Sequence, residues 1–139
     1  QIKVFFKHTD YFGSVHPYCY LEWMSYVREA YFQGLVENFM ELCQQDIKMV
    51  TAFVEFKLLG DAYFGDDIIV KIFSKNVRRL SFDVIFSFLK KKNNCLLGNG
   101  IQRLTFLNGI TGRPERIPED LKRQVLQYEE RVDSLAQAE

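Results

Sequence analysis

The order of hydrophobic and polar positions divides the chain into a short strand, a long helix, several strands and a final helix. Residues 2–7 alternate loosely and predict a strand. From Pro17 to about Leu42 the apolar residues recur at helical spacing, with polar residues kept to a narrow stripe. These apolar positions are Leu21, Met24, Val27, Tyr31, Leu35 and Phe39. The pattern predicts a helix that is buried over most of its circumference and begins at Pro17.

After residue 46 the pattern changes to that of strands. The first segment alternates apolar Val50, Ala52, Val54, Phe56 and Leu58 with Thr51, Phe53, Glu55 and Lys57, which predicts one covered face. Residues 68–73, 82–89 and 95–106 predict three further strands, with a hairpin turn at 90–94. Residues 118–139 predict an amphipathic helix. Its apolar side is expected to carry Leu121, Val125, Leu126 and Val132.

This element order predicts an α+β protein in which an antiparallel sheet of about five strands wraps a long central helix. Such an arrangement, with its short connections, is the hotdog fold. The chain has 139 residues, enough for one hydrophobic core and too few for two comfortable domains. We therefore expect a single domain spanning residues 1–139.

Composition and charge exclude several classes of function. Eighteen basic and eighteen acidic side chains cancel, so the positive field that nucleic-acid binding needs is missing. No run approaches the roughly 20 apolar residues that span a bilayer, and residues 1–7 lack the pattern of a signal peptide, so a cytoplasmic protein is expected. The three cysteines show no CxxC spacing, and His8 and His16 lack a carboxylate cluster. We expect neither a metal nor a cofactor.

Residues 9–21 carry a motif whose spacing is specific. Asp10, Gly13, Val15 and the Tyr20-Leu21 pair precede Arg28-Glu29 in the predicted helix. This arrangement resembles the motif of the 4-hydroxybenzoyl-CoA thioesterase family. Within that family the chain is most similar to the acyl carrier protein thioesterases of enediyne, polyene and polyunsaturated-fatty-acid synthases. Residues 48–51, Arg28 and residues 117–121 carry this closer resemblance.

The resemblance implies a hydrolase that cleaves acyl thioesters of coenzyme A or of an acyl carrier protein, in polyketide or fatty-acid biosynthesis. The functional positions of the enediyne subgroup match Asp10, Tyr20, Arg28 and Thr51. That subgroup usually has Asn at the position of Asp10, so this chain is expected to use a carboxylate. The family's Asn before the tyrosine is Cys19 here.

Asp10 is the expected catalytic carboxylate, which activates water or attacks the carbonyl carbon directly. The start of the helix offers free N–H groups for the developing oxyanion. Pro17 has no N–H, so Tyr18 or Cys19 would donate. Without the resemblance, an Asp before a helix is most often a capping residue. A nucleophilic Cys19 is the weaker alternative, since only His16 stands near it as a base.

Arg28 leaves the helix from its apolar stripe and therefore needs a partner or water. Two interpretations stay open. Arg28 is either structural, paired with a neighbouring carboxylate or extended to solvent, or it orients Asp10 or binds a carbonyl or carboxylate of a β-oxo acyl chain. Tyr20 is either an assisting hydroxyl or a core ring, and Thr51 is a candidate ligand-facing hydroxyl.

Two other classes of function remain as alternatives: a non-catalytic acyl-binding hotdog protein and a hotdog dehydratase. The presence of Asp10 argues against the first. Dehydratases of this fold carry a His/Asp or His/Glu pair on the helix, which His16 does not provide. An unpaired edge strand and the resemblance together predict a homo-oligomer, either a dimer or a homotetramer built as a dimer of dimers, with active sites at the subunit boundaries.

Overall fold

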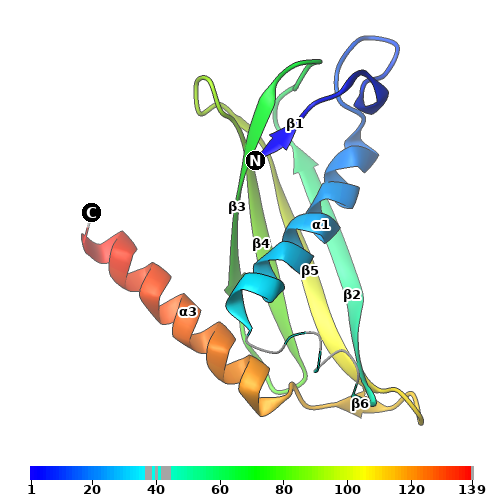
Figure 1. The fold of residues 1–139 in the computed structure, drawn as a ribbon, viewed down its shortest axis with the longest axis vertical. Helices are drawn as coiled ribbons and strands as arrows, with labels where there is room; N and C mark the ends of the chain where they lie inside the picture. Colours follow the sequence, from blue (N-terminus) through cyan, green and yellow to red (C-terminus); the bar gives the residue numbers. More distant parts are fainter. Residues whose placement is uncertain (37–38, 40, 42–44, 139) are drawn as a thin grey trace.

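A curled antiparallel sheet packs one face against a long helix, and a second helix runs past the lower end of the sheet (Figure 1). The computed structural model describes residues 1–36, 39, 41 and 45–138, and side chains up to residue 130. The elements are β1 (Ile2–Lys3), the 3-10 turn η1 (Phe6–His8), α1 (Pro17–Leu35), β2 (Ile47–Leu58), β3 (Asp67–Lys75), β4 (Ser81–Lys90), β5 (Leu96–Asn108), β6 (Pro114–Glu115) and α3 (Glu119–Ala138). The strand order is β1-β3-β4-β5-β2, with β6 paired to β5. The predicted α+β hotdog arrangement is confirmed.

Helix α1 begins at Pro17, as predicted, and ends earlier than Leu42. Gly34 weakens its last turn, and Val36 is extended and turns its β-branched side chain into the core, so the helix stops at Leu35. Of the predicted continuation to Leu42, only Phe39 and Glu41 lie within the described residues. The buried face also differs from the predicted stripe. Leu21 is exposed, and the core positions are Cys19, Tyr20, Trp23, Met24 and Phe32.

The central strands β4 and β5 place large rings opposite glycines. Phe82, Val84, Phe86 and Phe88 of β4 are all fully buried beneath α1. Facing Phe86 and Phe88 in the register are Gly100 and Gly98 of β5. A Cβ at Gly98 would lie 2.6 Å from the backbone oxygen of Lys57 on β2. Glycine therefore permits the close approach of β2 and α1 over this part of the sheet.

Strand β2 is an edge strand, and its predicted single covered face is wrong. A bulge between Thr51 and Phe53 breaks the alternation, so residues on either side of it do not keep one face. The apolar side chains that were expected to be covered are largely exposed instead. Val50 is 36% exposed, Val54 46% and Leu58 42%, and Phe53 is 44% exposed.

The two ends of the chain differ from the prediction in smaller ways. The strand expected over residues 2–7 stops at Lys3, because the Phe5 N–H donates to His8 Nδ1 and closes a turn. Helix α3 begins at Glu119, in agreement with the predicted tail, and buries Leu121 and Val125. Leu126 is 38% exposed, so it does not belong to the packed side. The side chain of Val132 lies outside the described residues.

Candidate active site

The loop that carries Asp10 is closed by its own hydrogen bonds. The Asp10 N–H donates to the Ser14 carbonyl at 2.8 Å, and the Gly13 N–H donates to the Asp10 carbonyl at 3.0 Å. Gly13 has φ +86°, which a residue with a side chain rarely adopts. The Asp10 carboxylate accepts from the Phe12 N–H at 2.9 Å and from the Ser14 hydroxyl at 3.4 Å. The carboxylate is thus held in one position, half-buried, ahead of α1.

Helix capping does not explain Asp10. The N-cap of α1 is His16, six residues further along the chain, and its side chain makes no capping hydrogen bond. The loop is instead attached to the segment before β3, through the Val15 N–H to the Ala62 carbonyl at 2.9 Å and a bridge between Ser14 and Tyr63. The helix-capping role that the sequence alone favoured for Asp10 is therefore not observed.

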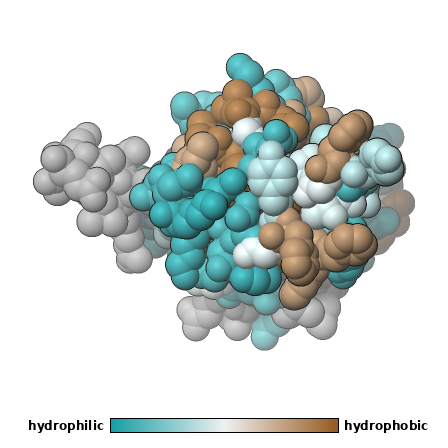
Figure 2. All heavy atoms as spheres, turned by 90° about the horizontal axis from the view of Figure 1, so that it is seen from above, coloured by the Kyte–Doolittle hydropathy of each residue, from teal (hydrophilic) through white to brown (hydrophobic). Residues whose placement is uncertain are grey.

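Aromatic side chains surround this end of the molecule. Phe6, Tyr11, Phe12 and Phe64 are each more than half exposed, and Phe6 contacts Phe64 edge-on. Figure 2 looks onto this end and shows hydrophobic groups lying directly beside hydrophilic ones. Exposed rings in such number are typical of a surface that contacts a ligand or another protein.

The first turn of α1 presents fewer free donors than expected. The Cys19 N–H donates to the His16 carbonyl at 3.0 Å. No acceptor for the Tyr18 N–H is found among the described residues. The Cys19 thiol is buried and donates weakly to the His8 carbonyl at 3.6 Å. Burial raises the pKa of this thiol, which opposes the nucleophilic role that was considered for it.

Arg28 and Thr51, two of the predicted site residues, lie in direct contact. Arg28 Nη1 donates to Thr51 Oγ1 at 2.8 Å and to Gln102 Oε1 at 3.1 Å. No carboxylate lies within 4.0 Å of the guanidinium in the described ranges. Burial lowers the pKa of Arg28, and the charge of Glu29 partly opposes this effect. A structural ion pair, one of the two open interpretations, is therefore not observed.

Tyr20 belongs to the core. Its ring is fully buried, stacks on Phe56 of β2 at a centroid distance of 4.6 Å and contacts Trp23 and Phe88 edge-on. Its hydroxyl has no hydrogen-bond partner within the part of the chain that is described. Burial raises the pKa of Tyr20 far above its ordinary value. The ring packing accounts for the side chain, and the unpaired hydroxyl keeps the assisting role open.

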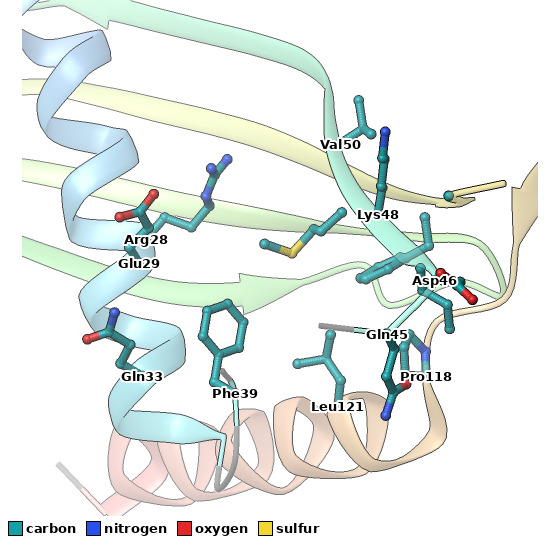
Figure 3. Close-up of a pocket in the computed structure, with 14 residues that line it drawn as sticks. Arg28, Glu29, Gln33, Phe39, Gln45, Asp46, Lys48, Val50, Pro118 and Leu121 are labelled. Carbon is teal, nitrogen blue, oxygen red and sulfur yellow. The ribbon is translucent and has the colours of Figure 1, made fainter. Parts of the chain in front are cut away.

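A cavity of about 750 Å³ lies beside Arg28. Its wall includes Lys48, Met49 and Val50 of β2, Phe106 of β5 and Leu121 of α3. In Figure 3, Arg28 extends from α1 into the space between α1 and β2, with Phe39 and Leu121 below it. A mostly apolar cavity with a few charged groups at its wall is typical of a ligand site.

Within one chain the structure separates the two principal site residues. Asp10 precedes the N-terminal end of α1, whereas Arg28 lies eleven residues beyond Pro17, which corresponds to about 16 Å along the helix axis. Gln102, which contacts Arg28, was not predicted. The alternation of β5 could have placed it inward between Gly100 and Leu104, but an isolated Gln in a strand gave no chemical signal.

No group of three or more His, Cys, Asp or Glu side chains among the described residues is arranged to hold a metal ion. None of the helices in the described ranges is long and apolar enough to span a bilayer.

Comparison with known proteins identifies relatives of the whole fold. The family model described as the Thioesterase-like superfamily matches residues 4–125. A search of curated proteins by sequence found no match. A thioesterase from Thermus thermophilus, solved with coenzyme A and Zn, is 25% identical with a TM-score of 0.75, over 89% of this chain and 93% of that chain.

Two further solved structures are less similar in sequence and closer in shape. The dynemicin thioesterase, described with induced-fit and allosteric effects upon polyene binding, is 20% identical with a TM-score of 0.83, over 91% of this chain and 93% of that chain. A 1,4-dihydroxy-2-naphthoyl-CoA thioesterase from Synechocystis is 13% identical with a TM-score of 0.82, over 90% of this chain and 92% of that chain. At these identities the likeness confirms the fold.

Proposed function

Since the chain belongs to the Thioesterase-like superfamily, we propose that it hydrolyses acyl thioesters of coenzyme A or of an acyl carrier protein and releases a free carboxylic acid. The expected enzyme class, a thioesterase, is confirmed at the level of this superfamily. The observation that carries the proposal is the family match itself, which spans the Asp10 loop, Arg28 and Thr51. The Thermus thermophilus enzyme with bound coenzyme A supports a coenzyme A thioester as one form of the substrate.

Asp10 acts on the thioester carbonyl in this proposal. Its carboxylate either takes a proton from water, whose oxygen then bonds to the carbonyl carbon, or attacks that carbon and forms an anhydride that water opens. In both routes the carbon–sulfur bond breaks, the thiolate leaves and is protonated, and the carboxylic acid is released. The two hydrogen bonds from Phe12 and Ser14 support this role, because they hold the carboxylate in place before substrate binds.

The Tyr18 N–H is the proposed donor to the oxyanion. Pro17 has no N–H, and the Cys19 N–H is engaged by His16. The positive end of the α1 dipole reinforces a donor at this place. Of the two donors expected from the sequence, Tyr18 is thus the better supported.

Arg28 and Thr51 bind the substrate in our proposal, and Tyr20 assists through its hydroxyl. The guanidinium lies at the wall of the 750 Å³ cavity, where it can donate to an oxygen of the acyl group. Because Asp10 and Arg28 lie far apart in one chain, we propose that each site combines Asp10 of one subunit with Arg28 of another. A site between two subunits fits the edge of β2, which no strand of the described residues pairs with and at which a second chain can add.

The biosynthetic context is proposed from sequence resemblance. Residues 48–51 and 117–121 resemble the enzymes that serve polyketide and polyunsaturated-fatty-acid synthases, and the dynemicin thioesterase is among the structures similar in fold. We propose an acyl carrier protein of such a synthase as the physiological donor of the acyl group.

The proposal is tested by assaying the purified protein with acyl-CoA thioesters of increasing chain length and with one acyl carrier protein conjugate, measuring released thiol. We expect turnover well above the spontaneous rate, with a preference for some acyl groups. The relative rates on coenzyme A and carrier protein decide which donor is used. Absence of turnover on every substrate, from protein with an intact circular dichroism spectrum, would contradict hydrolysis.

A further inference from the structure

Arg28 is held at the cavity by neutral groups. Its Nη1 donates to the Thr51 hydroxyl and to the Gln102 carbonyl oxygen, and its buried Nε has no partner among the described residues. Glu29, the next residue along α1, is exposed and attracts the guanidinium without forming an ion pair with it. The positive charge is therefore fixed in direction without being neutralised by a contacting carboxylate.

Gln102 is suited to fix this direction. It lies on β5 between Val54 of β2 and Val84 of β4, and its side chain is 2% exposed. A buried amide is unfavourable unless its polar atoms are hydrogen-bonded, and an apolar residue would pack equally well at this position. The hydrogen bond from Arg28 gives the oxygen of this buried amide its partner.

We propose that Gln102 is a positioning residue of the active site: together with Thr51 it aims Arg28 at the cavity and leaves the guanidinium charge for an oxygen atom of the acyl substrate. This inference rests on the proposed function and deepens it. A carboxylate in place of the amide would orient Arg28 equally well but would neutralise it. An apolar side chain would leave the charge and remove the orientation.

The orientation of Arg28 and the neutrality of its surroundings can be altered separately by two substitutions. Gln102→Glu keeps the shape and the acceptor and adds a negative charge, while Gln102→Met keeps the size and removes the acceptor. We expect each to lower kcat/KM about tenfold or more for dodecanoyl-CoA, and Gln102→Glu to act mainly through a higher KM. In an Arg28→Met background Gln102→Met should not lower kcat/KM further, because Gln102 acts through Arg28.

A matched control is Ser74→Ala. Ser74 is buried to the same degree and bonds to the Tyr31 hydroxyl at 3.0 Å, away from the cavity wall. We expect it to lower the melting temperature and leave kcat/KM unchanged. If Gln102→Met behaved like Ser74→Ala, or if its loss added fully to that of Arg28→Met, the positioning role would be overturned.

A binding measurement separates this inference from the proposed function. Calorimetric titration with dodecanoate, a product-like anion, needs no turnover. We expect Gln102→Glu to bind it at least fivefold more weakly than the wild type, whether or not the wild type hydrolyses any thioester. Equal affinity of the two proteins, or no binding to either, would overturn the inference even if hydrolysis were demonstrated.

Discussion

Asp10 is positioned by its own loop, so removing the Asp10 carboxylate should affect catalysis far more than folding. The carboxylate caps no helix, and its bonds to Phe12 and Ser14 lie near the surface. We expect Asp10→Ala to lower turnover about a hundredfold or more, the usual contribution of general acid–base assistance. Released thiol gives the rate, and thermal unfolding monitored by circular dichroism should shift by only a few degrees.

Asp61→Ala is the control for this change. Asp61 is an exposed carboxylate in the segment to which the Asp10 loop is attached. Removing it alters the charge at the same end of the molecule and should leave turnover close to the wild-type value. If Asp10→Ala retained near-wild-type turnover on the preferred substrate, the catalytic assignment of Asp10 would be wrong.

Arg28 allows a second test at the scale of one residue. Replacing a buried charge by an apolar residue of similar size is often neutral or stabilising when the charge is only structural. We expect Arg28→Met to change the melting temperature little, because the relief of a buried charge is offset by the Gln102 oxygen left without a partner, and to lower kcat/KM at least tenfold. Unchanged kinetics at an unchanged or higher melting temperature would reduce Arg28 to a structural ion.

A site residue could be predicted where a sequence motif includes it. It could not be predicted where only the packing of the folded chain brings it to the site. Asp10, Arg28 and Thr51 came from spacing and resemblance, and the structure brings Arg28 and Thr51 into contact. Gln102 meets Arg28 only because β5 and α1 pack together, a contact between residues 74 positions apart in sequence. No local pattern in the sequence distinguishes such a glutamine from any other polar residue in a strand.

Among the elements, the β3–β4 hairpin and its neighbour β5 share an ionic cluster around Asp83. Burial by itself would raise the pKa of Asp83, but hydrogen bonds from Arg103 at 2.9 Å, Arg78 at 3.2 Å and Asn76 at 3.0 Å outweigh it and lower the pKa to about 2. The charged form therefore stabilises the fold. This stabilisation is fully present above the ordinary pKa of about 3.9 and is lost as the pH falls toward 2.

We expect the free energy of unfolding of the wild type to fall by about 2 kcal/mol more than that of Asp83→Asn between pH 5 and pH 2. Urea unfolding at a series of pH values measures the difference. The control is Asp120→Asn. Asp120 forms an exposed pair with Arg123 on α3, so its replacement should change the pH dependence of unfolding little. Parallel profiles for the wild type and Asp83→Asn would show that the cluster does not hold this carboxylate.

Element type was predictable from periodicity, and element boundaries were not. Strands β3, β4 and β5 appear where the sequence predicted them, because their inner faces pack into the core beneath α1. The covered face predicted for strand β2 was wrong, because a bulge shifts its register and leaves Val50, Val54 and Leu58 exposed. The end of α1 also depended on tertiary contacts, in which Val36 turns into the core.

At the scale of the whole molecule, one chain holds the parts of the site far apart, before the start of α1 and in the second half of the helix. Asp10 precedes the first turn of α1, and Arg28 faces the cavity to which Leu121 of α3 contributes (Figure 3). A two-fold axis near the middle of β2 would pair this strand with its copy in antiparallel fashion. The two α1 helices would then run in opposite directions, with the Asp10 end of one beside the Arg28 half of the other.

We therefore expect at least a dimer in solution, joined through β2. The strand is twelve residues long, its outer edge is unpaired within the described residues, and Val50, Phe53 and Val54 are exposed along it. Native proteins rarely leave such an edge uncovered. Light scattering at micromolar concentration should give a mass at least twice that of the chain, and a dimer of dimers would give four times that mass.

Charge placed on this edge should separate the subunits and, with them, the two halves of the site. The double variant Val50→Lys with Val54→Lys places two positive charges on each of the paired strands, and their repulsion near the axis would oppose pairing. We expect a folded monomer with little or no turnover. Leu126→Lys makes the same change on the exposed side of α3 and should leave mass and turnover unaltered. A stable monomer with full activity, in the wild type or in the double variant, would overturn the shared site and require Asp10 and Arg28 of one chain to act without each other.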